Sequence, residues 1–441
     1  MTTQFSPFEE SLWHATAIKA PITSSLEEVI KTDICIVGGG YAGMSTALEL
    51  AKDGISVILL EAKEPGFGGS GRNAGHCTPT FHYYSLTALR KVLGIERAKN
   101  LIQRQTSGAN IAAEYIQKYQ IDCEWRQNGY FEGALIKSRL SLLQKKAESY
   151  AEVGCPSILI TSEQAKKLTG SDRFFGGWLL KSGGHLNPLS YARGMARAVL
   201  QEGGVIFTES KVDEVEQINN GWAVKTSKGK VIADKVIMCT GAYTDGGWKD
   251  LDKTFNIQKV FVAATNPMPK DVRRKVLPFD GTMHDGRGDI CVYKYDGEGR
   301  LVVSMFPVGK RGRDLPYTKK MLLDRLRWLH AAIPEGTQWD YFWFGELDMQ
   351  RHTIPRLYHL APGVIGCTGL SGRGVPTGTM LGGILSDWVR GVKDQELALP
   401  LEKLSTVPAY MKIAPSLMLR WYGIRDHIAA RLEGTELPPH A

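Results

Sequence analysis

Residues Thr32–Lys63 read TDICIVGGGYAGMSTALELAKDGISVILLEAK. The apolar run Ile34–Val37 is typical of a buried parallel strand, and a Gly-x-Gly-x-x-Gly turn follows it at 38–43. Apolar residues then recur at helical spacing, and a second apolar strand, Ile55–Leu60, ends beside Glu61. This order of strand, glycine-rich turn, helix, strand and acidic residue predicts a βαβ dinucleotide-binding unit.

Each part of this unit suits a dinucleotide. Gly38, Gly40 and Gly43 let the backbone turn sharply and approach a pyrophosphate without a Cβ between them. The helix that follows offers free N–H groups and a positive dipole end to the phosphates. Glu61 can accept hydrogen bonds from both ribose hydroxyls, and its charge disfavours a 2′-phosphate. The unit therefore predicts binding of FAD or NAD.

Composition narrows the class of protein. The chain has 441 residues, of which 43% are hydrophobic and 23% charged, as in an ordinary globular protein of two or three domains. Its net charge of +8 is spread along the chain without a basic block, so we expect no nucleic-acid partner. The N-terminus does not resemble a secretory signal, and no run of about 18 apolar residues occurs. We expect a cytoplasmic protein without a spanning segment.

The seven cysteines are scattered and form no Cys-x-x-Cys pair. This pattern favours reduced core thiols and predicts no metal site.

The single βαβ fingerprint favours FAD over NAD. A flavin reductase that also binds a pyridine nucleotide normally needs two such folds. The polar, glycine-rich loop Gly68–His76 suits pyrophosphate oxygens and ring heteroatoms. Two later segments, Thr240–Ala242 and Gly369–Gly374, return at the ends of strands, and the second directly precedes a helix. A helix N-terminus at a flavin would stabilise the negative charge of the reduced ring.

The rest of the chain predicts an α/β fold with an α+β second domain. We expect a Rossmann-like FAD-binding domain built from discontinuous segments, and a substrate-binding domain with a largely antiparallel sheet and helices. The predicted limits are 1–30 for an N-terminal arm, 31–105, 185–249 and 346–441 for the FAD-binding domain, and 106–184 and 250–345 for the substrate-binding domain.

Five motifs lie in order along the chain. They are DICIVGGGYAGMSTALELA with Glu61, GGSGRNAGH at 68–76, GHLNPLSYARGMARA at 184–198, VIMCTGAYT at 236–244, and IPRL with GVIGCTGLSGRGVPTGTMLGGILSDWVRG within 354–391. With this set the chain resembles the D-amino-acid oxidase, glycine oxidase and sarcosine oxidase type of FAD-dependent oxidoreductase, and within it the γ-glutamylputrescine oxidoreductase-like group.

The resemblance implies the FAD-binding positions. Relatives with covalent flavin carry His at the position of Asn73, so non-covalent FAD is expected. Relatives often carry His where this chain has Arg373. The implied positions are Gly38, Gly40, Tyr41, Ala42 and Gly43 at the pyrophosphate; Glu61 and Ala62 at the adenosine; Ser70, Gly71, Arg72, Asn73, Ala74, Gly75 and His76 along the pyrophosphate and isoalloxazine; Val212 at the adenine; Thr240 and Gly241 beside the cofactor; and Gly372, Arg373, Gly374 and Val375 at the flavin O2/N1 edge.

The resemblance also implies an oxidase of an amine or amino acid. A neutral amine would bind with its α-C–H over flavin N5, a hydride equivalent would move to the flavin, and the imine product would hydrolyse. Oxygen would reoxidise the flavin and give hydrogen peroxide. Two alternatives stay open. One is a dehydrogenase that uses a quinone or a carrier protein, and the other is a flavin-binding subunit of a hetero-oligomer without independent activity.

No catalytic residue stands out, but four side chains are candidates. His76 and Arg373 are expected near the flavin. Arg356 could hold a substrate carboxylate, although a structural ion pair is favoured. Tyr293 could line the substrate site, although core packing is favoured.

Residues 415–432 predict an amphipathic helix. It could dock on a membrane surface. The alternative, which we favour, is a terminal helix packed on the FAD-binding domain. Its apolar face would hold Leu417, Trp421, Ile424, Ile428 and Leu432, with Arg420, Arg425 and Arg431 around it.

Overall fold

The structure is a computed structural model of the chain. It describes residues 8–81, 85–155, 157–307, 309–312, 314–408, 410 and 414–438. The first seven residues of the predicted arm, residues 82–84 and residues 411–413 are among those outside the described ranges.

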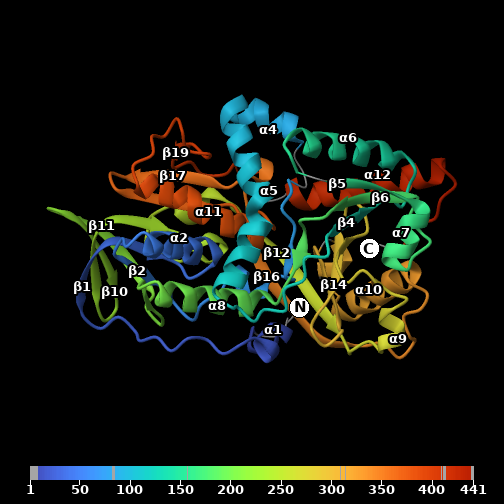
Figure 1. The fold of residues 1–441 in the computed structure, drawn as a ribbon, viewed down its shortest axis with the longest axis horizontal. Helices are drawn as coiled ribbons and strands as arrows, with labels where there is room; N and C mark the ends of the chain where they lie inside the picture. The colour runs from blue at the N-terminus through green and yellow to red at the C-terminus, as the bar shows by residue number, and fades with distance from the viewer. Residues whose placement is uncertain are drawn as a thin grey trace.

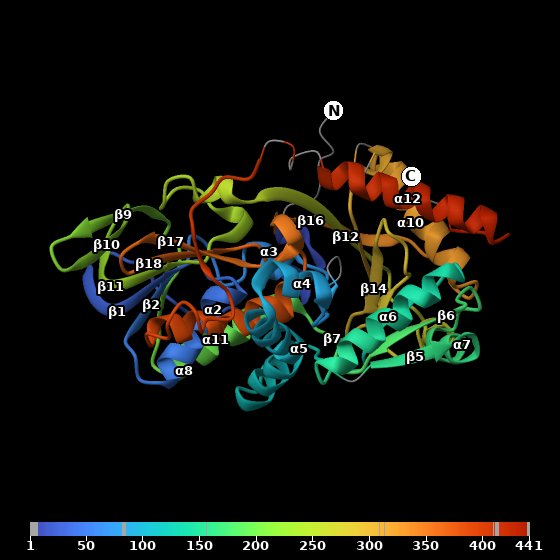
Figure 2. The same cartoon turned by 90° about the horizontal axis from the view of Figure 1, so that it is seen from above.

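The first of two large sheets is built around the predicted βαβ unit, which the structure confirms. Its strand order is β19-β17-β18-β11-β1-β2-β8, with β10 and β9 added beside β11. Strand β1 pairs in parallel with β2 and β11, and the helices α2, α8 and α11 cover one face of the sheet (Figures 1 and 2). The bounds are β1 Val29–Val37, β2 Val57–Leu60, β8 Val205–Phe207, β9 Val212–Ile218, β10 Gly221–Thr226, β11 Lys230–Met238, β17 Arg356–Ala361, β18 Val364–Thr368, β19 Leu401–Lys403, α2 Tyr41–Lys52, α8 Pro188–Gln201 and α11 Gly374–Val389.

Strand β1 is buried on both faces, as a central parallel strand should be. Ile34 and Ile36 pack in the core beneath the helices, whereas Cys35 and Val37 point to the opposite face. At the end of the strand Gly38 has a φ of +111°, which favours glycine.

The second sheet is largely antiparallel, as expected. Its order is β16-β12-β15-β14-β13-β4-β6-β5, and only the β13–β4 pair is parallel. Strands β14 and β15 are consecutive and pair antiparallel, as a hairpin. The bounds are β4 Tyr130–Gly133, β5 Ser157–Thr161, β6 Gly176–Leu180, β12 Asn256–Thr265, β13 Thr282–His284, β14 Cys291–Tyr295, β15 Leu301–Met305 and β16 Trp339–Met349.

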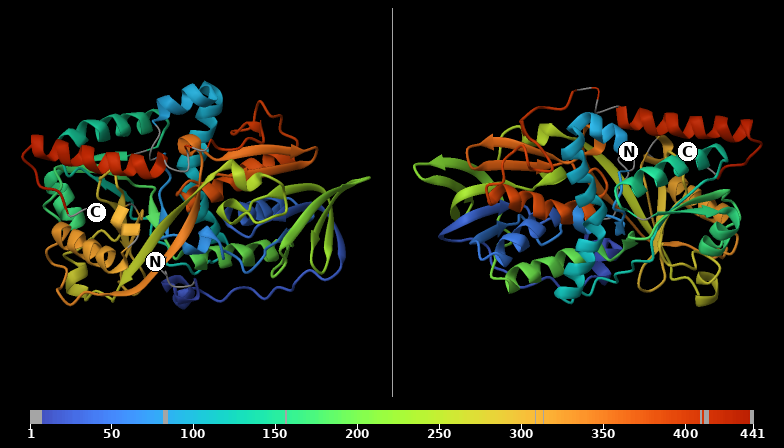
Figure 3. Two further views of the ribbon diagram at one scale, coloured as in Figure 1. Left: turned by 180° about the vertical axis from the view of Figure 1, so that it is seen from behind. Right: turned by 45° about the horizontal axis from the view of Figure 1, so that its top comes forward.

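Further helices and short strands surround the two sheets (Figure 3). The predicted domain limits at 105/106 and 345/346 fall inside α5 and β16, which run through them without a break. The remaining bounds are α1 Leu12–Thr16, α3 Gly69–Arg72, α4 Leu86–Leu93, α5 Ile95–Lys118, α6 Ser138–Glu152, α7 Ser162–Thr169, α9 Lys270–Arg273, α10 Leu315–Leu329, α12 Ala414–Leu432, β3 His76–Cys77, β7 Gly184–His185, η1 Phe8–Glu10, η2 Gly241–Tyr243, η3 Leu251–Thr254, η4 Gly309–Gly312 and η5 Arg351–Thr353.

The C-terminal helix α12 corrects one expectation, because it packs beside the second sheet rather than on the FAD-binding side. Leu419 packs with Phe306, the residue after β15. The carboxylate of Glu433 accepts from the backbone N–H groups of Lys137 and Ser138, at the start of α6. These apolar and polar partners for the inward face of α12 all lie in the second-sheet region.

None of the described helices is long and apolar enough to cross a bilayer.

We predict that Gly43→Ala destabilises the protein. A Cβ at this position would lie 2.0 Å from the carbonyl oxygen of Gly38, so α2 would have to move away from β1. Overpacking of this kind costs about 1–3 kcal/mol of unfolding free energy. Urea denaturation measures it. Gly336→Ala is the control, because none of the described residues beyond its chain neighbours lies within 4 Å of its Cβ position. Equal stability of the two variants would contradict the prediction.

Candidate active site

A cavity of about 1000 Å³ runs from the carboxyl ends of β1 and β11 to the face of the second sheet. This volume is at the upper end for ligand sites, which leaves room for a dinucleotide and a small substrate together. The first-sheet end of the cavity is formed by the first turn of α2 and the loop after β2. The other end is formed by β4, β13 and β15, so residues from both sheets line one space.

Most of the predicted cofactor-binding residues line this cavity. The structure brings together Gly38, Gly40, Tyr41, Ala42, Glu61, Ala62, Ser70, Asn73, Ala74, His76, Val212, Thr240, Gly241, Gly372 and Gly374. Six predicted positions are not in the wall: Gly43, Gly71, Arg72, Gly75, Arg373 and Val375.

Glu61 stands at the adenosine end predicted from the sequence. Its carboxylate accepts hydrogen bonds from Gly39 N at 2.6 Å and Lys63 N at 2.9 Å, which fix its position at the end of β2. Burial raises the pKa of Glu61, and these two N–H groups oppose the rise. Each carboxylate oxygen has a second lone pair available for a ribose hydroxyl.

The glycine-rich turn has the open backbone that a pyrophosphate needs. Among the described residues other than its chain neighbours, only Ser70 Oγ lies within 4 Å of the Cβ position of Gly40, at 3.1 Å, and Gly40 lines the cavity. Ser70 Oγ also accepts from Tyr41 N at 3.0 Å, which holds the loop after β2 against the first turn of α2. The residues present therefore fit FAD, with the pyrophosphate at this turn and the ribose at Glu61.

Asn73 is held within its own loop. Its Nδ2 donates to Ser70 O at 2.7 Å, and its Oδ1 accepts from Gly75 N at 2.8 Å. Its backbone oxygen accepts from Trp13 Nε1 at 2.7 Å, so the N-terminal arm supports the same loop. Neighbouring His76 lies in the cavity wall with Nδ1 3.4 Å from Thr282 Oγ1.

Arg72 differs from its expected position along the cofactor. Its guanidinium lies over the rings of Phe8 and Phe67, and its Nε donates to Phe67 O at 2.8 Å. These aromatic faces and the carbonyl hold the side chain away from the cavity wall.

Arg373 is also placed outside the wall. Its side chain is buried, donates to Thr80 O at 2.9 Å and to Thr353 O, and lies over the ring of Phe81. Backbone carbonyls therefore take the donors that we expected at the flavin edge, while the neighbouring Gly372 and Gly374 still face the cavity.

The other two catalytic candidates lie elsewhere. Arg356 forms an ion pair with Glu402 between β17 and β19. Tyr293 is buried in the core of the second sheet, where its hydroxyl lies 2.7 Å from His330 Nε2. Neither residue lines the cavity, which agrees with the structural roles favoured from the sequence.

Asp348 connects the end of β16 to the turn before α11. Its buried carboxylate accepts from Gly369 N at 2.6 Å and Leu370 N at 3.1 Å. Burial raises the pKa of Asp348 to about 6, although these N–H groups oppose the rise.

The second-sheet end of the cavity holds a polar cluster that sequence reasoning missed. We call it the Glu132 cluster, and it comprises Tyr130, Glu132, Arg139, Lys146 and His284. Glu132 Oε1 accepts from Arg139 Nη2 at 2.8 Å, and Glu132 Oε2 accepts from Lys146 Nζ at 2.5 Å. His284 Nδ1 lies 3.2 Å from the hydroxyl of Tyr130 and 4.0 Å from Glu132 Oε1. All of these residues except Lys146 line the cavity.

The charges of this cluster are set by burial and proximity. Burial disfavours the charged form of Glu132, but Lys146 and Arg139 outweigh it and hold the pKa of this carboxyl well below its usual range. Burial lowers the pKa of His284, so the imidazole is neutral at pH 7. The cluster contains two cations, Arg139 and Lys146, and one carboxylate, Glu132, so its net charge is positive.

The parallel pairing of β13 with β4 creates the cluster, because it aligns His284 with Glu132. The two residues are 152 positions apart in the sequence, and no local pattern marks the pairing. The only available signal was an acidic residue inside an apolar strand, which is costly to bury without a partner.

Comparison with known proteins identifies relatives across most of the chain. The family model for FAD-dependent oxidoreductases (DAO) matches residues 33–388. The chain is 30% identical to γ-glutamylputrescine oxidoreductase of Escherichia coli K12 over 383 residues, which cover 86% of this chain and 89% of the relative. It is also 30% identical to a probable oxidoreductase, OrdL, of Haemophilus influenzae over 382 residues, which cover 85% and 86%.

Solved structures share the fold. L-amino acid deaminase from Proteus myxofaciens, in complex with anthranilate, superposes with a TM-score of 0.70 at 18% identity, covering 89% of this chain and 97% of that one. Glycine oxidase from Geobacillus kaustophilus gives a TM-score of 0.67 at 19% identity, covering 87% and 98%.

We expect Gly40→Val to abolish FAD binding. The branched side chain would extend into the cavity where the pyrophosphate is expected, whereas the surrounding structure contributes only the Ser70 hydroxyl nearby. Flavin absorbance per protein, with circular dichroism as a check of folding, measures the result. Gly336→Val is the matched control, and stoichiometric flavin in folded Gly40→Val would overturn the placement.

We expect Glu132→Gln to destabilise the protein by about 3–5 kcal/mol at pH 7, because it leaves two cations without their buried counter-charge. Since the folded pKa of Glu132 is below the unfolded value of about 4.3, its contribution is present above that pH and is lost as the pH falls. The difference from the native protein in urea denaturation should therefore shrink below about pH 4.

Glu163→Gln is the control, because Glu163 forms an exposed pair with Lys167. This change should cost at most about 0.5 kcal/mol. A pH-independent loss in Glu132→Gln would show that shape rather than charge matters at this position.

Proposed function

The chain belongs to the FAD-dependent oxidoreductase family, and we propose that it is an oxidase of an amine or amino acid with non-covalently bound FAD. The observation that carries the proposal is the single cavity, which joins the dinucleotide-binding turn to the Glu132 cluster. A substrate at the cluster and the far end of the cofactor would share this enclosed space. The absence of a histidine at Asn73 supports non-covalent binding.

When bound, FAD supplies the chemistry by accepting a hydride equivalent from the carbon that bears the amine. The protein contributes position and electrostatics. Excess positive charge from Arg139 and Lys146 favours a neutral amine over an ammonium ion, and the neutral form is the one that can be oxidised. The resulting imine hydrolyses in water, and the two electrons reduce oxygen to hydrogen peroxide.

Arg139 favours a substrate that also carries a carboxylate. Its Nη2 is engaged by Glu132, and the residue lines the cavity, so the guanidinium has further N–H donors at this wall. A substrate carboxylate in the cavity could pair with this guanidinium through a charge-assisted hydrogen bond. This favours amino acids, or amines that carry an acidic group, as substrates.

A dehydrogenase remains the second candidate. The observation in its favour is the exposed apolar face of α12, since two residues of this helix, Tyr422 and Arg425, also line the cavity. A membrane-dissolved quinone could approach from that side.

Anaerobic titration with a panel of amino acids and amines tests the proposal. An oxidase loses its yellow colour with its substrate and regains it in air with release of peroxide. Loss of colour that does not return rapidly in air but is reversed by a quinone would indicate the dehydrogenase. If no compound bleaches the flavin, the protein is better described as a flavin-binding subunit. A colourless protein that binds NAD would overturn the proposal altogether.

We predict that Arg139→Gln lowers kcat/KM by roughly tenfold or more for the panel compounds that carry a carboxylate, because a charged hydrogen bond is lost. Amines without a carboxylate should be affected much less. Arg90→Gln is the control, since Arg90 lies at the surface beside Glu152. An equal loss for both classes of substrate would assign Arg139 a purely structural role.

A further inference from the structure

The outward face of α12 is apolar. Trp421 is 59% exposed, Ile424 and Ile428 are each 51% exposed, and Leu417 and Leu432 are exposed at the two ends. These five residues recur at helical spacing and form one stripe, which we call the α12 stripe. Helix α12 is an outermost element of the molecule, as the right panel of Figure 3 shows.

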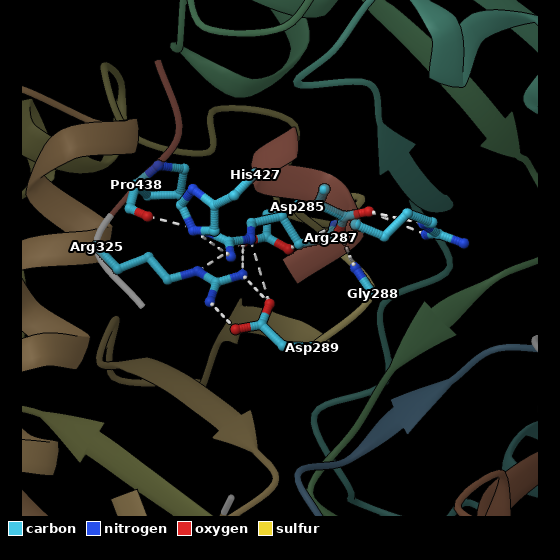
Figure 4. A network of polar contacts seen from close by, with 9 residues as sticks. Asp285, Arg287, Gly288, Asp289, Arg325, His427 and Pro438 are labelled. Carbon is cyan, nitrogen blue, oxygen red and sulfur yellow. Dashed lines mark hydrogen bonds and ion pairs between the residues drawn. The ribbon is translucent and has the colours of Figure 1, made fainter. Parts of the chain in front are cut away.

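The stripe cannot turn inward, because the opposite face of α12 already has its partners. Asp426 Oδ2 accepts from Gly288 N at 2.7 Å. Arg287 Nη1 donates to Pro438 O at 2.8 Å, and its Nη2 lies 3.4 Å from His427 Nε2 (Figure 4). These contacts fix the rotation of the helix about its axis.

A buried ion-pair network holds the loop that contacts α12, which includes Arg287 and Gly288. Arg325 donates to Asp285 at 2.8 Å and to Asp289 at 3.0 Å, and Asp289 lies 3.3 Å from Arg287 Nε (Figure 4). All four side chains are almost completely buried, so the loop that receives α12 is rigidly held. The exposed stripe is thus a property of the folded protein.

The exposed charged side chains beside the stripe are arginines, one of which, Arg425, also pairs with the buried Asp426 at 2.9 Å. Between residues 417 and 432 the exposed charged side chains are Arg420, Arg425 and Arg431, whereas the one acidic residue, Asp426, is buried. Arg420 lies beside Gly309 in η4, next to the exposed Lys310. This arrangement complements a layer of anionic groups. Two copies of the stripe packed together would bring arginines close to arginines.

We propose that α12 docks the protein on the surface of an anionic lipid bilayer. The stripe would enter the boundary between headgroups and acyl chains, and the arginines would contact lipid phosphates. Tyr422 and Arg425 of α12 and the exposed Leu142 of α6 line the cavity, so docking would bring that end of the cavity close to the bilayer. The docking does not depend on which electron acceptor is used.

Co-sedimentation of the FAD-loaded protein with vesicles tests the proposal. Binding is expected to vesicles of phosphatidylcholine with phosphatidylglycerol, to weaken as salt is added, and to be much weaker with phosphatidylcholine alone. Ile428→Ser should lower the partition coefficient by roughly tenfold, and Arg420→Gln by about fivefold. The control Ile22→Ser should bind like the native protein, because Ile22 is fully exposed but lies in the N-terminal arm next to Thr23, which contacts Thr208 after β8.

Flavin content and circular dichroism verify that each variant is folded. The proposal is overturned if the native protein does not bind anionic vesicles, or if Ile428→Ser and Ile22→Ser bind equally. It is also overturned if the protein is a dimer without lipid and Ile428→Ser makes it a monomer, since the stripe would then be covered by a second copy. Should Ile428→Ser fail to fold, the salt dependence and Arg420→Gln decide.

Discussion

Close contact between two backbone segments sets the position of everything at the dinucleotide end. The carbonyl of Gly38, at the end of β1, lies against α2 at Gly43 with no space for a Cβ between them. This contact brings the first turn of α2 to the sheet edge, and the loop after β2 is then held against that turn by Ser70. A larger residue at Gly43 would displace the helix start and the expected pyrophosphate position with it, whereas one at Gly38 would meet the carbonyl of Cys239 after β11.

The opposite end of the cavity depends on electrostatics rather than on close packing. A buried carboxylate on β4 is stable only because two cations from α6 reach it. The cluster therefore costs desolvation energy that an apolar wall would avoid, and such arrangements are common where a site needs a fixed field. The two ends of the cavity thus differ in kind: backbone N–H groups at one end and side-chain charges at the other.

The sequence predicted the parts of the site that are local in the chain. These parts are the βαβ unit, Glu61 and the loop from Ser70 to His76. They could be predicted because their residues are contiguous in the sequence and their geometry is set by glycines and strand ends. The Glu132 cluster could not be predicted, because it depends on the register between two strands that are far apart in the sequence. Arg72 and Arg373 show a different limit. Their residue type suits anions, but nearby aromatic rings and carbonyls, which only tertiary structure brings together, take their guanidinium groups.

Asp348 has a consequence for how the molecule responds to its ligand. This carboxylate belongs to a strand of the second sheet, yet it holds the turn that leads into α11 on the first sheet. We therefore expect the free energy of FAD binding to stabilise both sheets together, so that the cofactor would stabilise the whole chain. The two sheets are expected to unfold in one cooperative transition, and cellular supply of flavin would then govern how much folded protein accumulates.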